Sequence, residues 1–414
     1  MNRPALRQSR SLQSLTPVEV AAGLRHLPGM VFFDTAGNVP SNYGNPVSIV
    51  AANPRELIKG SIRKEEDREM LREVLRENAD ELSADRGFPL GGLCGWVDYE
   101  GDFVFGDYPE MLVHTHDGGW HENGSLSQQI ANEATTDEFE IGQVHAEWSR
   151  ERFVEAVDRI REWIAAGDIY QVNLSQRFEA EVTGASLFGL YQALRDASPA
   201  PMGSWLSLDG REVLSSSPET FLRISGSGIE TRPIKGTRPR FSDPTADRRS
   251  AYELQTSPKE IAELVMITDL LRNDLGQVCE FGSVAVDEML QLETLEQVHH
   301  LVSTVSGRLR DDHGPVDALA ACFPGGSITG APKRRAMEII SELEGVPRGL
   351  YCGAIGYLGY NGESQFNIAI RTMVRQAGKL RFHAGAGIVA DSDPLKEYEE
   401  TLHKAAGIRM ALGA

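Results

Sequence analysis

The sequence predicts an α+β fold, and three observations support this prediction. Near the start of the chain, apolar runs with the character of strands stand before and after an isolated helical segment, which differs from repeating βαβ units. Turn residues recur at short intervals between these runs. The length of 414 residues exceeds the size at which one core usually keeps growing, so we expect two domains or one large intergrown sandwich. The polar stretch between His114 and Gln143 marks the expected boundary, between an N-terminal subdomain of residues 1–140 and a second unit of residues 145–414.

The N-terminal part is expected to begin its folded structure at Thr16, because Thr16 to Glu19 (TPVE) has the pattern of a helix capping box. The residues before it carry Arg3, Arg7 and Arg10 and no acid, which faintly resembles an organelle transit peptide; a short basic arm is the favoured interpretation. Short strands are expected within 30–50, a charged helix over about 64–82, and buried strands at 91–97 and 103–105.

The second part is expected to open with an amphipathic helix over about 150–166 that stops at Gly167. The segment IYQVNLSQRF (169–178) has the composition of a strand, and 205–208 with 213–215 should form a hairpin that turns at Asp209-Gly210. A further strand pair, 221–224 and 229–234, would place Glu219 and Lys235 at strand ends. Rigid scaffolds often hold reactive groups at such positions.

Composition limits the functional class. The formal net charge of −19 argues against nucleic acid or an anionic membrane as the main partner, although a local group of Arg, Lys and backbone amides can still bind a small anion. No apolar run is long enough to cross a bilayer and the start lacks a hydrophobic signal core, so we expect a soluble, cytoplasmic protein. Four widely spaced cysteines, which fit reduced thiols better than disulfides or zinc, stand at Cys94, Cys279, Cys322 and Cys352.

The segment TRPIKGTRPR (231–240) contains the most suggestive single residue, Lys235. Its prolines and glycine predict a rigid turn. The nearby Arg232, Arg238 and Arg240 would disfavour the charged form of the lysine, and a neutral lysine is a nucleophile or a base. Taken alone, such a residue is usually a solvated lysine at a loop tip.

Two acidic pairs predict a magnesium site. Glu260 and Glu263 lie three residues apart in KEIAELVMITDLLRNDLG, and Glu397 and Glu400 repeat this spacing in DSDPLKEYEETLHKA. On helices, each pair would share one face. Mg²⁺ usually binds through one or two carboxylates together with substrate oxygens and waters. Each pair alone is more often part of a solvated helix surface.

Glycine-rich segments and one arginine predict an anion site. In PGGSITGAPKRRAMEII, Gly325, Gly326 and Gly330 suggest a flexible turn, after which Pro332 would be the first residue of a helix whose backbone amides can bind a carboxylate.

In FHAGAGIVADSD, Gly385 and Gly387 are expected between a strand and the last helix. Arg371 is expected in a mostly apolar strand, where it needs an anionic ligand or a structural ion pair as its partner.

His300, in the predicted strand HHLVS, is a further candidate, although one histidine on a strand face is more often a satisfied core residue. The group of Asp269, Arg272, Asn273 and Asp274 is interpreted as a buried structural network at a helix end.

In this order, the segments closely resemble the chorismate-utilising enzymes, the family of anthranilate synthase component I, aminodeoxychorismate synthase component I and the isochorismate and salicylate synthases. The resemblance covers residue 150 to the C-terminus and is weaker before it. It implies a large intergrown antiparallel β-sandwich with surrounding helices. It also implies that Glu263 and Glu400 hold Mg²⁺ with Glu260 and Glu397 around them, and that His300 lies near the leaving hydroxyl. The residues implied to bind the two carboxylates and the ring of chorismate are Gly236, Thr237, Thr329, Tyr351, Arg371, Gly385, Gly387 and Lys404.

Two positions separate the subfamilies. The isochorismate and salicylate branch has a lysine base where this chain has Gln171, which disfavours water as the nucleophile. Anthranilate synthases resemble PIAGT and aminodeoxychorismate synthases PIKGT, the form found here. The resemblance therefore implies that Lys235 attacks C2 of chorismate while the C4 hydroxyl leaves with help from Glu219, and that ammonia then attacks C4. Glu219 would need a pKa raised by burial or by nearby carboxylates.

The sequence shows no glutaminase signature and no lyase segment after Ala414, so we expect ammonia to come from a separate glutamine amidotransferase and aromatisation to be another enzyme's task. Tryptophan feedback is doubtful, because FFDTAGNVP stands where regulated anthranilate synthases have a Leu-Leu-Glu-Ser element. A structural tryptophan is left open, since APMGSW around Met202 resembles the segment beside that pocket in some relatives. The alternatives are anthranilate synthase component I and, from another class, a non-catalytic binding or regulatory module of the same fold.

Overall fold

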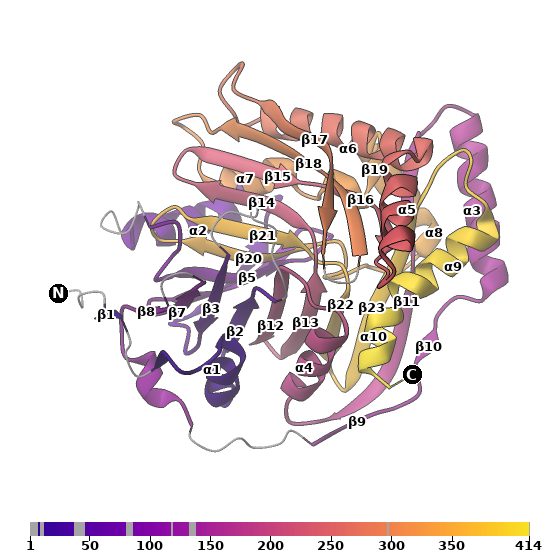
Figure 1. Ribbon diagram of the computed structural model, residues 1–414. Helices are drawn as coiled ribbons and strands as arrows, with labels where there is room; N and C mark the ends of the chain where they lie inside the picture. The colour runs from indigo at the N-terminus through magenta and orange to yellow at the C-terminus, as the bar shows by residue number, and fades with distance from the viewer. Residues whose placement is uncertain are drawn as a thin grey trace.

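The computed structural model describes residues 7–8, 12–36, 46–79, 86–116, 119–131, 138–295 and 298–413. Within these ranges the chain forms two large antiparallel sheets with helices around them (Figure 1). The predicted α+β sandwich is confirmed. No helix in the described ranges is both long and apolar enough to span a bilayer.

The first sheet has 13 strands and joins both halves of the chain. Its neighbouring strands, in order, are β1 (Arg7–Gln8), β8 (Gly119–Glu122), β7 (Leu112–Thr115), β3 (Val47–Ala51), β2 (Val31–Asp34), β12 (Met202–Leu208), β13 (Arg211–Ser217), β22 (Thr372–Gln376), β23 (Lys379–Ile388), β11 (Gln171–Gly184) and β10 (His145–Ala146), with β9 (Phe139–Ile141) and β19 (Gly330–Ala331) also paired to β11. The predicted hairpin is β12 and β13, and the strand expected over 169–178 is the start of the longer β11.

The second sheet has ten strands, and two of them contain the candidate catalytic residues Lys235 and His300. Its order is β16 (Ile234–Pro239), β18 (Val298–Arg308), β15 (Gly228–Arg232), β14 (Thr220–Ser225), β21 (Ser364–Ile368), β20 (Ala354–Gly359), β5 (Gly92–Val97), β6 (Asp102–Tyr108) and β4 (Leu57–Ser61), with β17 (Ala285–Thr294) paired to β18. Residues 1–140 therefore supply strands to both sheets, at the β2–β12 and β5–β20 pairings.

The helices cover the outer faces of the sheets (Figure 1). They are α1 (Pro17–Leu24), α2 (Glu65–Glu77), α3 (Arg150–Ala165), α4 (Phe188–Ala197), α5 (Pro244–Gln255), α6 (Pro258–Gly276), α7 (Pro315–Cys322), α8 (Lys333–Glu344), α9 (Pro394–Lys404) and α10 (Ala406–Ala411), with short 3₁₀ turns at Leu126–Gln129 and Gly326–Ile328. The predicted capping box opens α1, where the Glu19 amide donates to Thr16 Oγ1 and the Thr16 amide donates to Glu19 Oε2. The helix expected over 64–82 ends at Glu77 as α2, and residues 80–85 lie outside the described ranges.

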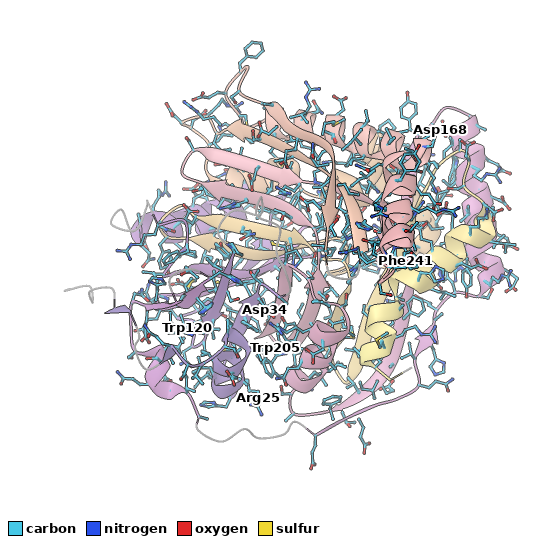
Figure 2. All side chains as sticks on the ribbon, in the orientation of Figure 1. Arg25, Asp34, Trp120, Asp168, Trp205 and Phe241 are labelled. Carbon is cyan, nitrogen blue, oxygen red and sulfur yellow. The ribbon has the colours of Figure 1, made fainter. Side chains whose placement is uncertain are left out.

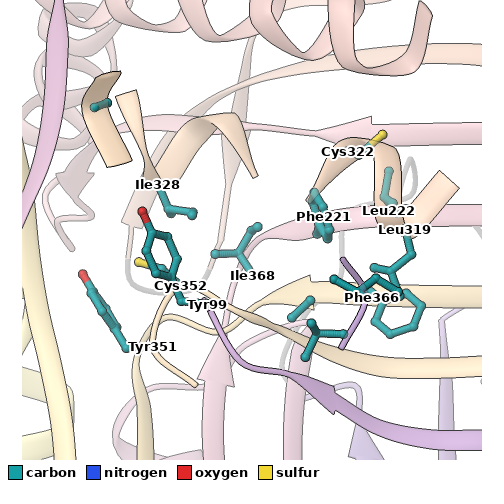
Figure 3. Packing of buried hydrophobic residues seen from close by; sticks show 14 of the residues in the cluster. Tyr99, Phe221, Leu222, Leu319, Cys322, Ile328, Tyr351, Cys352, Phe366 and Ile368 are labelled. Carbon is teal, nitrogen blue, oxygen red and sulfur yellow. The ribbon is translucent and has the colours of Figure 1, made fainter. Parts of the chain in front are cut away.

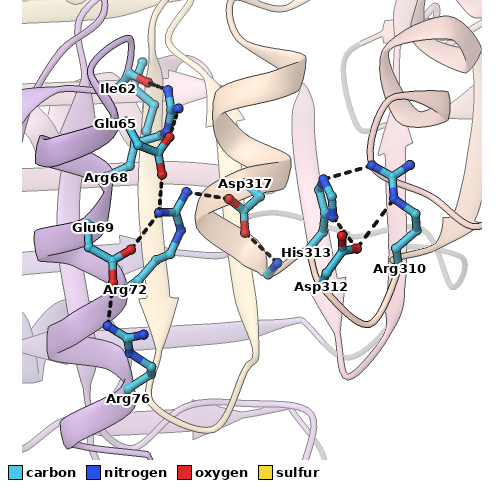
Figure 4. Close-up of polar contacts among 11 residues, drawn as sticks. Ile62, Glu65, Arg68, Glu69, Arg72, Arg76, Arg310, Asp312, His313 and Asp317 are labelled. Atoms are coloured by element: carbon cyan, nitrogen blue, oxygen red, sulfur yellow. Dashed lines mark hydrogen bonds and ion pairs between the residues drawn. The ribbon is translucent and has the colours of Figure 1, made fainter.

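Three main hydrophobic layers stabilise this arrangement. Trp96 and Ile355 of the second sheet pack against Leu206 and Val213 of the first, which makes the contact between the sheets apolar. Helices α1, α4 and α10 cover the opposite face of the first sheet, and α3, α7 and α8 belong to the largest core, part of which is drawn in Figure 3. Ion pairs add to these contacts at the surface, where Arg72 of α2 donates to Asp317 of α7 at 2.6 Å (Figure 4).

Candidate active site

Lys235 lies in an edge strand that contains a bulge. In β16, Lys235 pairs with Leu301 and Thr237 pairs with His300, so Gly236 is the extra residue. Gly236 has a φ of +69°, and a Cβ on it would lie 2.6 Å from Leu254 Cδ1. The predicted rigid turn is therefore wrong, because the prolines and the glycine belong to a bulged edge strand, where such residues are tolerated.

The Lys235 ammonium faces carboxylates. Its Nζ donates to the Ser327 carbonyl oxygen at 3.3 Å and lies 3.9 Å from Glu263 Oε2. The three neighbouring arginines each pair with an acid instead: Arg232 with Glu293, Arg238 with Glu260 at 3.6 Å, and Arg240 with Asp247 at 2.9 Å. Each of these arginines therefore has an acidic partner of its own, and their effect on Lys235 stays a prediction.

Glu219 is a buried acid in the same site. It lies between β13 and β14 with 5% of its surface exposed. Burial raises its pKa to about 7, against a hydrogen bond from the Ser327 side chain and the charges of Lys235 and Lys404. The expectation that burial raises this pKa is confirmed, and the carboxyl holds a proton in much of the population near neutral pH.

Glu263 and Glu397 are the buried members of the two acidic pairs. Glu263, on α6, accepts a hydrogen bond from Gln171 Nε2 at 3.2 Å. Burial raises the pKa of Glu263, and the Lys235 and Lys259 charges oppose this rise. Glu397, on α9, accepts from Lys259 at 3.1 Å, while its Oε2 is buried with no hydrogen-bond partner.

The other two acids are more open. Burial acts to raise the pKa of Glu400, but the charges of Lys404, Lys259 and Lys235 outweigh burial, so the net effect is a lowered pKa. The nearest of these cations is Lys404, whose Nζ lies 2.8 Å from Glu400 Oε1. Glu260 meets the Arg238 guanidinium, and its amide donates to Ser257 Oγ at the start of α6.

The oxygen donors of these four glutamates are of the type that Mg²⁺ prefers, and a magnesium site stays a prediction. In the described part of the chain, no three acidic, His or Cys side chains converge closely enough to hold a metal by themselves. The four glutamates nevertheless come from α6 and α9, the charge of Glu400 acts on Glu263, and Glu397 Oε2 is an unused buried acceptor. Oxygen donors of this kind suit Mg²⁺, which keeps several positions for water and substrate oxygens.

His300 is held as a neutral acceptor. Its Nδ1 lies 3.1 Å from Thr237 Oγ1 and 3.2 Å from the Gly236 carbonyl oxygen. Burial, with the charge of Arg371, lowers its pKa to about 4, so the ring is neutral at physiological pH. A carbonyl can only accept, so Nδ1 carries the proton and the buried, unpartnered Nε2 is left as an acceptor.

Arg371 is a cation without an ion-pair partner among the described residues. It precedes β22 with a φ of +50° instead of lying within a strand, because the chain bends there between β21 and β22. The predicted strand position is therefore wrong. No hydrogen bond or ion pair reaches its guanidinium from any residue in the described ranges, and burial lowers its pKa. A desolvated guanidinium beside His300 is suited to bind a carboxylate.

Gly385 and Gly387 lie close to side chains of the candidate site, where a side chain of their own would not fit. Both lie inside β23 and not after it, which corrects the predicted position. A Cβ at Gly387 would lie 2.4 Å from Gln171 Nε2, and one at Gly385 would lie 2.8 Å from the Tyr351 hydroxyl oxygen. Lys404 Nζ donates to the Gly385 carbonyl at 3.0 Å, so the end of α9 is tied to this strand.

The segment before α8 is ordered by pairing with β11. Gly330 and Ala331 form β19, where Ala331 pairs with Gln171, and Thr329 is fully buried with Oγ1 donating to the Gly325 carbonyl at 3.1 Å. The predicted turn is present as the 3₁₀ turn Gly326–Ile328, and Gly330 lies after it in β19. Pro332 is the N-cap of α8, which begins one residue later than predicted because Pro332 is extended.

Comparison with known proteins agrees with this geometry. The model of the chorismate binding enzyme family matches residues 48–410. The chain belongs to the chorismate binding enzyme family. It is 41% identical to anthranilate synthase component 1 of Methanothermobacter thermautotrophicus over 84% of this chain and 79% of that protein. It is 48% identical to aminodeoxychorismate synthase component 1 of Salmonella typhimurium over 62% of this chain but only 56% of that protein.

Solved structures of the family share the fold. Anthranilate synthase component I from Streptococcus pneumoniae matches with a TM-score of 0.75 and 30% identity, over 90% of this chain and 93% of that one. The menaquinone-specific isochorismate synthase MenF from Escherichia coli matches with a TM-score of 0.77 over 99% of this chain and 95% of that one. At 18% identity, this second match shows the fold alone.

Two contributors to the chorismate-family site, Ser327 and Lys259, were missed in the sequence. Ser327 contacts Lys235 through its carbonyl and Glu219 through its side chain. Lys259 precedes Glu263 by four residues on α6, a spacing that could have placed it on the same face.

Of the predicted network at the end of α6, Asp274 does form a buried pair with Lys333 at 2.7 Å, whereas Asp269 and Arg272 pair in solvent.

A cavity outside the candidate active site lies between the sheets beside Asp34 and Met202, at the two segments considered for tryptophan. Asp34, labelled in Figure 2, accepts from Arg195 Nε at 2.6 Å and from the Tyr191 hydroxyl at 3.0 Å, while its buried Oδ1 has no hydrogen-bond partner among the described residues. Residues 37–40 of the first segment lie outside the described ranges, and tryptophan binding stays a prediction.

Proposed function

We propose that this protein aminates chorismate at C4 to give 4-amino-4-deoxychorismate, a step toward 4-aminobenzoate and folate, in the cytoplasm. The observation that carries the proposal is the position of Lys235, whose Nζ lies within reach of Glu263 and whose charge acts on Glu219. A nucleophile and a protonated acid in one site are the two groups that this reaction requires.

The proposed reaction has two steps. The Lys235 amine attacks C2 of chorismate, the ring double bonds shift, and the C4 hydroxyl leaves as water with the proton held by Glu219. Ammonia then attacks C4, the ring double bonds shift back and the bond from C2 to Lys235 breaks, which releases the lysine as a neutral amine. The ammonium group formed at C4 gives one proton back to Glu219, which restores the enzyme. His300, with a free acceptor nitrogen, would orient a hydroxyl group of the ring.

The remaining groups bind the substrate. Arg371 would bind one carboxylate, since its guanidinium has no ion-pair partner in the described part of the chain, and the glycines at 385 and 387 let the ring approach β23. Mg²⁺ at Glu263 and Glu400, with Glu260 and Glu397 around it, would supply positive charge for the ring carboxylate. Ammonia would come from a glutamine amidotransferase subunit, which the word "component" in the names of the relatives supports.

A second candidate is anthranilate synthase component I, which aminates C2 and releases pyruvate. The Methanothermobacter relative, which matches 84% of this chain, carries that name. Lys235 distinguishes the candidates chemically, because attack by ammonia at C2 leaves this lysine without a covalent role.

Product analysis tests the proposal. The protein is incubated with chorismate, Mg²⁺ and ammonium, with and without an added aminodeoxychorismate lyase, and the products are separated by chromatography. We expect 4-aminobenzoate only when the lyase is present. Formation of anthranilate alone would contradict the proposal, and chorismate binding without turnover, even with the amidotransferase added, would support a non-catalytic module.

The matched variants are Lys235→Ala and Lys59→Ala, since Lys59 is a half-exposed lysine paired with Asp209 outside the site. Lys235→Ala should abolish C4 amination while Lys59→Ala keeps it. An anthranilate synthase would retain its activity after the Lys235 substitution.

A further inference from the structure

Arg348 is a buried arginine outside the groups assigned so far. It follows α8 and has 4% of its surface exposed. Its guanidinium donates from Nε and Nη2 to the two carboxylate oxygens of Glu344, at 2.9 and 2.7 Å. It also donates from Nη1 to the Ile328 carbonyl at 3.3 Å and from Nη2 to the Asn173 carbonyl at 2.7 Å. The planar group thus reaches a carboxylate and two main-chain carbonyls at once.

The two carbonyls belong to the peptides that fix Thr329. The Ile328 carbonyl precedes Thr329 and also accepts from Asn173 Nδ2 at 3.1 Å. The Asn173 amide donates to the Thr329 carbonyl at 2.9 Å. Arg348 therefore holds the peptide before Thr329 directly and the carbonyl of Thr329 indirectly, through Asn173; Thr329 is a residue of the candidate chorismate site.

The Arg348 guanidinium packs against two tyrosine rings, those of Tyr99 and Tyr351. The guanidinium carbon lies 4.8 Å from the Tyr99 ring centre and 5.5 Å from that of Tyr351. Tyr351 in turn stacks on His383 at 4.9 Å with an interplanar angle of 10°. Tyr99, Tyr351 and Ile328 are drawn together at one end of the core in Figure 3. The cation therefore sets the plane of the tyrosine whose hydroxyl approaches Gly385.

Two further contacts fix this arrangement. Ser175 Oγ donates to Glu344 Oε1 at 2.9 Å, which holds the carboxylate that orients Arg348. The Glu100 carboxylate, in the turn between β5 and β6, accepts from the amides of Arg348 at 2.9 Å and Gly349 at 3.2 Å. The segment is thus held by the N-terminal part of the chain as well as by α8.

We propose that Arg348 is a positioning residue for chorismate binding, acting through Thr329 and Tyr351 without touching the substrate. The inference rests on the proposed function because it takes these two residues as parts of the chorismate site. It does not depend on which carbon is aminated, so its test follows whichever amination product forms.

The first experiment compares Arg348→Lys with Arg375→Lys. Lysine keeps the charge opposite Glu344 but cannot reach both carbonyls and lie between the rings. Arg375 is a matched control, because it also contacts one carboxylate (Glu212, 2.6 Å) and two carbonyls (Gly184, 2.6 Å, and Ala185, 3.1 Å) away from the site. We expect the KM for chorismate to rise about tenfold or more in Arg348→Lys, as for the loss of strong hydrogen bonds, and to stay near the original value in Arg375→Lys. An unchanged KM and kcat/KM in folded Arg348→Lys would overturn the inference.

A double-mutant cycle separates positioning from general stability. Arg348→Lys and Tyr351→Leu should raise the KM by less together than the product of their separate effects, because both act through the same ring. Independent effects on KM would contradict action through Tyr351. If Arg348→Lys does not fold, Glu100→Gln gives the second measurement: a smaller rise in KM is expected, and a KM equal to that of the original protein would overturn the inference.

Discussion

Glu219 shows how one buried residue can be prepared for chemistry. Its pKa of about 7 results from burial, which outweighs the nearby charges of Lys235 and Lys404. The carboxyl is protonated below this pH and ionised above it, so the acid form that the proposed first step needs is lost as the pH rises. We therefore expect kcat/KM for amination to fall as the pH increases through about 7.

The variant Glu219→Gln identifies the group responsible. An amide cannot give up a proton, so kcat should fall by about 10²–10⁴-fold, the usual contribution of a general acid. The loss of kcat/KM above neutral pH should also disappear. The measurement is the steady-state rate against pH at constant ionic strength, with Mg²⁺ saturating. A variant that keeps the same fall in rate near pH 7 would assign that titration to another residue.

At the residue scale, the sequence predicted groups that act through their side chains. The acids of α6 and α9, Lys235 and His300 come together as the motifs suggested, although their roles in catalysis stay predictions. Ser327 and Arg348 were missed for a physical reason. Ser327 contacts Lys235 through a main-chain carbonyl, and Arg348 acts through carbonyls distant in sequence, so neither contact leaves a local signature.

At the scale of the element, β16 depends on its bulge, and Gly236→Ala tests that dependence. Alanine at a φ of +69° is strained, and its Cβ would also crowd Leu254 and Glu260. We expect a loss of about 1–3 kcal/mol in the free energy of unfolding, together with a lower kcat because Lys235 is displaced. Denaturant unfolding and the amination rate measure the two effects.

Gly226→Ala is the matched control for this substitution. Gly226 has a φ of +56°, and nothing lies within 4 Å of the Cβ that alanine would add. It should therefore show the cost of the backbone conformation alone, with kcat unchanged. Equal losses of stability and an equal kcat in the two variants would mean that crowding at the bulge has no effect on Lys235.

The sequence predicted most helices and strands correctly. The segments that it misassigned are those that contain residues of the candidate chorismate site. Proline and glycine in TRPIKGTRPR indicate a turn by local rules, and the same residues suit a bulged edge strand. Gly385 and Gly387 are strand residues because β23 pairs with β11, and they are glycines because neighbouring atoms, among them Tyr351 and Gln171, leave no space for a Cβ. The local pattern cannot separate these cases, since the deciding contacts come from other parts of the chain.

At the scale of the whole molecule, the two sheets join distant segments. The α+β class and the hairpin β12–β13 could be predicted from local patterns, whereas the full strand order could not, because pairings such as β2–β12 and β5–β20 bring together residues far apart in sequence. β5 pairs with β20 and β2 pairs with β12, so residues 1–140 complete both sheets formed by residues 145–414. The boundary predicted in the polar stretch lies between these two segments of chain, which share the apolar layer around Trp96, Ile355 and Leu206.

This interleaving predicts that residues 145–414 do not fold stably alone. Removing residues 1–140 would expose the edges of β20 and β12, together with apolar surface that Trp96 and Ile49 now cover. Unpaired edges and exposed apolar surface favour aggregation over a cooperative fold. We expect the fragment to elute as aggregates, with no sharp thermal transition, and co-expression with residues 1–140 to restore a defined complex. A monomeric fragment that unfolds cooperatively and binds chorismate would instead show that 145–414 is an autonomous domain, with the N-terminal strands as an addition to it.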